Sequence, residues 1–228
     1  MKTKRKSLPL RIIAVCAICA LDLLCGVGYL YYVNMRGGTL FYASHASDNI
    51  CGTLRQGLIV AACPFLLFLI SLSVLKKDFW GEMYLRICGK RQALTIVLLI
   101  SVLAIMTVAG LILKEDKVTI LYNLFYYLVL IALTEEFVVR GVCVYLLKDF
   151  SWKVRYLIPN VVFGIMHIFA YSNYRNLSPN YIIHFLSSNL LGLLAAGCLF
   201  QFLKEKSGTL WVPILIHAIC DYSVIFSY

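Results

Sequence analysis

The feature that most constrains this chain is a series of apolar runs, most of them about as long as a bilayer is thick. A helix needs about 20 mostly apolar residues to cross the hydrocarbon core. Seven runs approach or exceed this length: 12–34, 56–75, 93–113, 118–147, 156–172, 181–203 and 209–227. The sequence therefore predicts an all-α fold, a bundle of about seven transmembrane helices, or eight, in a single integral membrane domain (residues 1–228).

Composition excludes the soluble alternatives. Hydrophobic residues make up 61% of the 228 residues and charged residues 14%, against about 45–50% and about 25% in average soluble domains. Disordered chains are poor in large apolar residues, so disorder is excluded as well. The first run is longer than the apolar region of a signal peptide, and we expect it to be retained as a helix. Most of the nine cysteines lie inside the runs, where a thiol packs as a small hydrophobe, so no disulfide framework is expected.

The net charge of +10 is distributed as in a membrane protein. With the N-terminus inside, 15 Lys and Arg residues lie in inner segments (1–11, 76–92, 148–155 and 204–208), five lie in outer segments, and Arg140 lies within a run. Loops rich in Lys and Arg stay in the cytoplasm. We therefore predict a multi-pass protein of the cell membrane with a cytoplasmic N-terminus and an outer C-terminus, and no nucleic-acid partner.

Ionisable residues inside the runs are few, and such residues are costly in a membrane, so each is a candidate functional residue. They are Asp22, Glu135, Glu136, Arg140, His167, His184, His217 and Asp221. Glu135, His167 and His217 lie 11–13 residues from basic residues at the inner ends of three different helices. At about 1.5 Å per residue, all three are roughly 17–20 Å deep. Unrelated structural histidines would have no reason to share this depth, so we expect one site.

Two further residues are expected to lie outside that site. His184 is 20 residues from Lys204, near the outer end of its helix, which favours an interfacial or hydrogen-bonded histidine. Asp22 is 11 residues from Arg11 and so has the right depth, but no motif surrounds it. A packing or supporting role is the better interpretation for Asp22.

Helical spacing suggests separate roles for the two adjacent carboxylates. Glu136 and Arg140 are four residues apart in the order that favours an ion pair, and pairing lets both charges persist in an apolar interior. Glu135 is turned about 100° from Glu136, so it can face another helix. Glu135 is therefore our candidate for the reactive carboxylate, a general base or acid, with Glu136 and Arg140 as its scaffold.

Two more pairs repeat the four-residue spacing on later helices. His217 and Asp221 share one face, where the carboxylate can accept a hydrogen bond from the imidazole and orient it. Phe163 and His167 share another, with the phenyl ring one turn from the histidine.

Together these spacings resemble a known family. EExxxR at 135–140, FxxxH at 163–167 and HxxxD at 217–221 resemble the motifs of the CPBP intramembrane proteases, the CAAX-processing and bacteriocin-processing enzymes also called the Abi family. The resemblance covers residues 119–228. It implies a helix bundle with a cavity at the motif helices, and hydrolysis of a peptide bond in a membrane-associated peptide or protein without an acyl-enzyme.

The resemblance also implies residue roles. Glu135 and His167 would activate the water, and His217 with the residue at position 221 would stabilise the oxyanion. The prenyl-protein proteases of the family have Asn at that last position. Asp221 could donate a hydrogen bond only if protonated, or it could instead orient His217.

Other interpretations remain at this point. Glu135, His167 and His217 match a His₂Glu zinc set, although the resemblance favours a metal-free, glutamate-based mechanism. A non-catalytic bacteriocin self-immunity protein and a proton-coupled transporter are the rival functions. The transporter is weakened by the missing internal repeat.

Overall fold

The computed structural model describes residues 8–35, 43–74, 85, 87–169 and 178–227. Within these ranges all regular structure is helical, so the all-α prediction is confirmed. The α-helices are α2 (Leu8–Met35), α3 (Ile50–Val60), α4 (Ala62–Val74), α6 (Lys90–Leu113), α7 (Lys117–Phe125), α8 (Thr134–Glu136), α9 (Val144–Leu146), α10 (Trp152–Met166), α11 (Pro179–His184), α12 (Leu190–Ser207) and α13 (Trp211–Tyr222). The predicted basic start at 1–7, most of the segment 76–92 and residues 170–172 lie outside the described residues.

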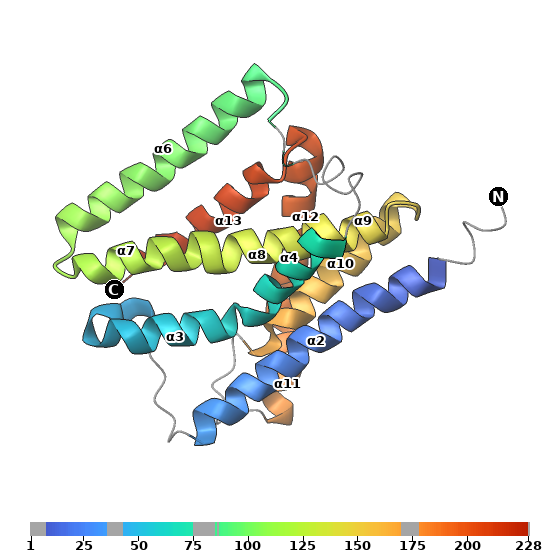
Figure 1. Ribbon diagram of the computed structural model, residues 1–228, viewed down its shortest axis with the longest axis horizontal. Coiled ribbons are helices and arrows are strands. Elements are labelled where there is room, and N and C mark those ends of the chain that lie inside the picture. The colour runs from blue at the N-terminus through green and yellow to red at the C-terminus, as the bar shows by residue number, and fades with distance from the viewer. Residues whose placement is uncertain (1–7, 36–42, 75–84, 86, 170–177, 228) are drawn as a thin grey trace.

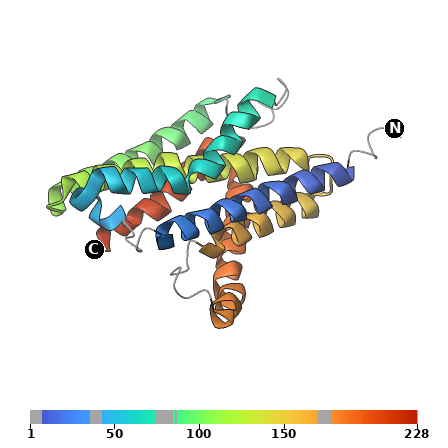
Figure 2. The ribbon, with the colours of Figure 1, turned by 60° about the horizontal axis from the view of Figure 1, so that its bottom comes forward.

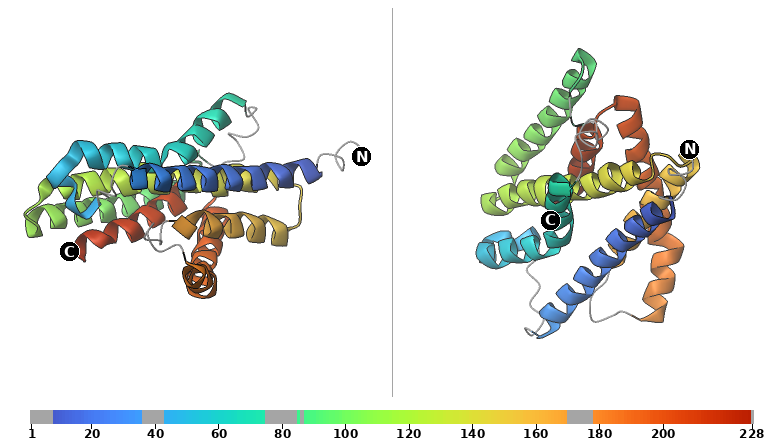
Figure 3. Two further views of the ribbon diagram at one scale, coloured as in Figure 1. Left: turned by 90° about the horizontal axis from the view of Figure 1, so that it is seen from below. Right: turned by 45° about the vertical axis from the view of Figure 1, so that its right-hand side comes forward.

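The fourth apolar run forms the axis of the bundle. From α7 to α9 it is continuously helical, with π-helical stretches η2 (Tyr126–Leu133) and η3 (Phe137–Cys143) on either side of α8. Figure 1 shows this segment crossing the middle of the molecule, with α6 and α13 on one side and α2 and α10 on the other. Two further views show α11 and α12 projecting from the layer formed by the other helices (Figures 2 and 3).

Three helical segments of the described chain are long and apolar enough to cross a membrane. They are Pro9–Tyr29, Lys90–Leu113 and Pro179–Ser207, and a shorter apolar helix covers Trp211–Phe226. Their surfaces carry large apolar side chains, such as Leu94 on α6, which is 71% exposed. Extensive exposed apolar surface of this kind is typical of contact with lipid.

The second run differs from the prediction of one span, because α3 and α4 are separate helices with Ala61 between them. The physical reason is Pro64. Proline has no backbone N–H, so the bond that would reach back to the Val60 carbonyl is missing. The neighbouring bonds, from Ala61 N to Gly57 O and from Phe65 N to Ala61 O, are present at 2.9 Å. The proline in the fifth run has less effect: α10 continues through Pro159 and begins at Trp152, before the predicted start.

Polar contacts at the helix ends join segments that the charge pattern places on the same side. Arg11 pairs with Asp149 at 2.6 Å, and Gln92 donates to the Ser207 carbonyl at 2.9 Å. On the side predicted to be outer, Ser47 N donates to Thr119 Oγ1 at 3.2 Å. These pairs fix the helix ends that hold the motif residues between them.

The buried core between α6, α13 and the axial helix is apolar. It includes Ile96, Leu103, Ile120, Phe137, Leu210, Ile214, Leu215 and Tyr222. A second cluster joins α2 to α9 and α10, and a third joins η3, α10 and the π-helical stretch η6 (Phe185–Asn189) to α12. The motif residues therefore project into a packed environment rather than into a loop.

Candidate active site

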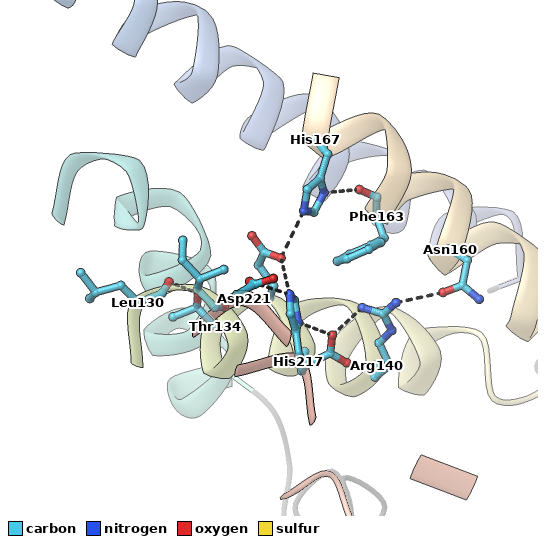
Figure 4. Close-up of polar contacts among 11 residues, drawn as sticks. Leu130, Thr134, Arg140, Asn160, Phe163, His167, His217 and Asp221 are labelled. Atoms are coloured by element: carbon cyan, nitrogen blue, oxygen red, sulfur yellow. Dashed lines mark hydrogen bonds and ion pairs between the residues drawn. The ribbon is translucent and has the colours of Figure 1, made fainter. Parts of the chain in front are cut away.

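The structure brings the motif residues of three separated segments into one cluster. Glu135 and Glu136 end α8, Arg140 follows on η3, Phe163 lies on α10, His167 follows α10, and His217 and Asp221 lie on α13. Figure 4 shows His167, His217, Arg140 and Asp221 converging around the axial helix. The convergence expected from helical depth is therefore present in the fold.

Glu135 lies between the two histidines. Its Oε2 atom is 3.5 Å from Nε2 of His167 and 3.9 Å from Nε2 of His217. Nδ1 of His167 is 2.7 Å from the Phe163 carbonyl oxygen. Because a carbonyl only accepts, Nδ1 carries a hydrogen, and Nε2 of the neutral ring is left as an acceptor facing Glu135. A carboxylate oxygen and an imidazole nitrogen thus face each other at 3.5 Å, a distance longer than an ordinary hydrogen bond.

Glu136 is shared by two partners. Its Oε1 atom accepts from Nη1 of Arg140 at 2.8 Å and from Nδ1 of His217 at 2.9 Å. The ion pair predicted from spacing is therefore present. The orientation of His217 differs from the expectation, because Glu136 and not Asp221 holds Nδ1. Asp221 instead lies near the other ring nitrogen, with Oδ2 3.2 Å from Nε2.

Aromatic rings enclose the cationic side of the cluster. The guanidinium carbon of Arg140 lies 4.2 Å from the centroid of the Phe163 ring, within cation–π range. The Phe163 ring is also 4.4 Å from the imidazole of His167, and Phe200 on α12 stacks on His217 at 5.0 Å. One phenyl group of the FxxxH motif therefore packs against both Arg140 and His167.

Solvent exposure divides the cluster into a sealed part and an open part. The side chains of Glu136 and Arg140 are fully buried. Those of Glu135 and His167 are partly exposed, and Asp221 is 34% exposed. The open edge of the cluster is therefore the edge that carries Glu135, His167 and Asp221.

Three residues around the cluster were not identified from the sequence: Asn160, Phe200 and Lys204. Asn160 accepts from Nη2 of Arg140 at 3.2 Å. The sequence placed Lys204 in an inner segment between two helices, whereas the structure has it inside a helix. It lies within α12, is 3% exposed, and donates to the Arg140 carbonyl at 2.5 Å. A long lysine stem can follow apolar surface, which lets the charged group enter the bundle from a helix end.

The two residues expected outside the site have other surroundings. His184 is exposed at the end of α11, and its Nδ1 atom is 3.3 Å from Ser188 Oγ in the next turn. Asp22 is half-buried on α2.

The zinc alternative concerns Glu135, His167 and His217. In the described part of the chain no group of three His, Cys, Asp or Glu side chains is arranged to hold a metal ion. Each nitrogen of His217 faces a carboxylate, Glu136 on one side and Asp221 on the other. The preference for a metal-free site therefore stays a prediction.

Comparison with known proteins finds a family match for the part of the chain that carries the motifs. Residues 117–223 match the family described as type II CAAX prenyl endopeptidase Rce1-like. The match includes all the motif residues and confirms the family predicted from them. No curated protein and no solved structure matches the chain.

Proposed function

We propose a specific reaction for this protein. Residues 117–223 match the Rce1-like endopeptidase family, whose members are CAAX-type intramembrane proteases. The protein hydrolyses a peptide bond of a membrane-associated peptide or protein, using a water activated by Glu135 and His167. The observation that carries this proposal is the 3.5 Å approach of the Glu135 carboxylate to Nε2 of His167. A water at the open edge of this pair can be hydrogen-bonded by both groups.

We propose the following proton transfers. Glu135 takes one proton of the water as a general base, and the oxygen attacks the scissile carbonyl carbon. The carbonyl oxygen becomes an oxyanion. The C–N bond then breaks as the protonated Glu135 returns its proton to the leaving amine. Water supplies the new carboxylate oxygen, and no acyl-enzyme forms.

His217 is proposed to stabilise the oxyanion. Its Nδ1–H is committed to Glu136 at 2.9 Å, so only Nε2 can face a substrate. When Nε2 carries a proton, it can donate to an oxyanion. Asp221, at 3.2 Å from that nitrogen, accepts this hydrogen in the absence of substrate. We therefore propose that Asp221 orients His217 rather than donating to the substrate itself.

The proposed substrates are prenylated proteins that end in a CAAX sequence, the class that the family description names. Processing of a bacteriocin leader peptide is the other substrate class compatible with the same chemistry. In a self-immunity protein that acts without cleavage, the ability of the Glu135 carboxylate to accept a proton would have no role. That difference separates the two kinds of function.

The test uses the purified protein in lipid nanodiscs and an S-farnesylated CAAX peptide. Cleavage in H₂¹⁸O is followed by mass spectrometry, and the new C-terminal carboxylate is expected to contain ¹⁸O. Glu135→Gln is expected to reduce kcat by about 10²–10⁴-fold, the usual contribution of a general base. Glu115→Gln, the same change in the exposed turn between α6 and α7, is the matched control.

Two outcomes would contradict the proposal. A folded Glu135→Gln variant with full activity would show that the mechanism is wrong. No cleavage of the farnesylated peptide by the wild-type protein would exclude the CAAX class. Membrane and secreted peptides from cells with the wild-type protein or the Glu135→Gln variant would then be compared to identify the substrate.

A further inference from the structure

The guanidinium of Arg140 is held from a helix outside its own. Figure 4 shows Asn160, on α10, on the far side of Arg140 from His217. The amide nitrogen of Asn160 donates to the Tyr156 carbonyl at 2.7 Å and contacts Cys198 Sγ at 3.4 Å. These donor contacts fix the orientation of the amide, so its oxygen faces Nη2 of Arg140 at 3.2 Å. Asn160 is 1% exposed, and water therefore does not compete for this bond.

The main chain of Arg140 is held by a different helix. Lys204, on α12, donates from Nζ to the Arg140 carbonyl at 2.5 Å. An ammonium group is costly to bury unless it is hydrogen-bonded and balanced by an opposite charge. Here the carbonyl supplies the bond, and the carboxylates of Glu205 and Glu136 supply electrostatic attraction. The side chain and the backbone of Arg140 are thus held separately, by α10 and α12.

A glycine on α12 makes room for this arrangement. A Cβ atom added at Gly197 would lie 2.6 Å from Asn160 Oδ1 and 2.9 Å from Arg140 Nη2. Both distances are shorter than a carbon can approach these atoms, so a methyl group there would displace the amide, the guanidinium or both. Five residues earlier on the same helix, a Cβ at Gly192 would meet nothing within 4 Å.

We propose that Asn160 and Lys204 are positioning residues of the catalytic site. Gly197 lacks a side chain and so leaves the space in which Asn160 contacts Arg140. The connection runs from Asn160 to Arg140, from Arg140 to Glu136, and from Glu136 to Nδ1 of His217. Each step is a contact of 2.8–3.2 Å. The orientation of the oxyanion-stabilising imidazole therefore depends on Asn160 of α10, which lies against Gly197 of α12, and on Lys204 of α12, which holds the Arg140 carbonyl. The proposal rests on the proposed function for its kinetic consequence.

The kinetic test compares two glycine-to-alanine changes on one helix. Gly197→Ala is expected to lower kcat for the farnesylated CAAX peptide by about tenfold or more, because small displacements of catalytic groups have effects up to about 10²-fold. KM is expected to change less than about twofold, since no contact with the bound peptide is altered. Gly192→Ala is the matched control, with both constants unchanged. Equal effects of the two substitutions would overturn the proposal.

Two further variants guard against misfolding of Gly197→Ala. Asn160→Ala and Lys204→Met remove the bonds without adding an atom near Arg140, and each is expected to lower kcat with little change in KM. Lys204→Arg retains a donor for the Arg140 carbonyl and is expected to recover part of the loss. Wild-type kcat in folded Asn160→Ala and Lys204→Met would overturn the assignment.

A measurement without substrate separates this proposal from the proposed function. The chain has four histidines, so ¹⁵N-histidine labelling in nanodiscs gives few signals to assign in solid-state NMR. The Nδ1 signal of His217 is expected to shift in Gly197→Ala and Asn160→Ala, whereas the His184 signals stay in place. An unchanged His217 signal in both variants would refute the positioning role. Retained activity in Glu135→Gln would refute the proposed function but leave this result standing.

Discussion

Glu136→Gln removes one charge from the most deeply buried ion pair of the described chain. Glu136 and Arg140 are both completely inaccessible, and the same Glu136 oxygen also accepts from His217. The glutamine amide is similar in shape to the carboxylate, so packing is retained and the electrostatic loss is isolated. Removing one partner of a buried ion pair costs about 3–5 kcal/mol, since the other charge is left uncompensated. We therefore expect the free energy of unfolding to fall by about 3–5 kcal/mol.

The matched control is the pair between Arg11 and Asp149. It joins the same two kinds of group at 2.6 Å, but its side chains are 28% and 39% exposed. Solvent screens such pairs, whose typical contribution is about 0–1 kcal/mol. Asp149→Asn is therefore expected to lower the free energy of unfolding by less than about 1 kcal/mol.

Both variants can be measured by equilibrium unfolding in mixed micelles with increasing sodium dodecyl sulfate. Labelling of the buried thiols Cys19 and Cys143 reports the unfolded fraction. The expected result is a loss for Glu136→Gln several times larger than that for Asp149→Asn. If the two losses were equal and both below about 1 kcal/mol, the pair would behave as a solvated one, and the reasoning from burial would be refuted.

Three further predictions concern other parts of the chain. His184→Ala is expected to keep wild-type kcat and KM for the farnesylated peptide, because this ring contacts Ser188 at the exposed end of α11; a complete loss of activity would show that the depth argument is wrong. For Asp116, at the start of α7, partial burial raises the pKa, but hydrogen bonds from Ser47 and Thr119 outweigh that effect and lower the pKa overall. A lowered pKa in the folded state means that stability is lost as the pH falls below about 4. The melting temperature should therefore decline between pH 5 and about 3, and Asp116→Asn should make that decline smaller. Finally, metal chelators are expected to leave peptide cleavage unchanged, and elemental analysis is expected to find zinc below one equivalent; activity lost on chelation and restored by zinc would contradict the metal-free mechanism.

The site could be located from the sequence because charged residues in apolar helices are scarce and helical rise is regular. Counting residues from the basic ends placed Glu135, His167 and His217 at one depth, and the structure has them within 4 Å of a common carboxylate oxygen. Spacing also identified the pair of Glu136 with Arg140. Neither inference needed the packing of the helices to be known.

The supporting residues could not be found in that way. Asn160 is uncharged, and nothing in its local sequence distinguishes it from a polar residue that faces lipid headgroups. Lys204 stands at the end of an apolar run, where lysines usually face the cytoplasm. Its burial depends on how α12 approaches η3, and that approach is set by Gly197 and by contacts between helices distant in sequence. The partner of Nδ1 of His217 was missed for the same reason.

The helical segment around Thr134–Glu136 restricts where residues can be inserted into or deleted from this chain. In an α-helix each residue turns the chain by about 100°, and π-helical stretches absorb extra residues within a helix. Between Glu135, which faces His167, and Arg140, which faces Asn160, one inserted or deleted residue would rotate one contact away from the other. Side chains in this segment can be exchanged one at a time, but its residue count is fixed by Asn160 on α10 and by His167 directly after that helix.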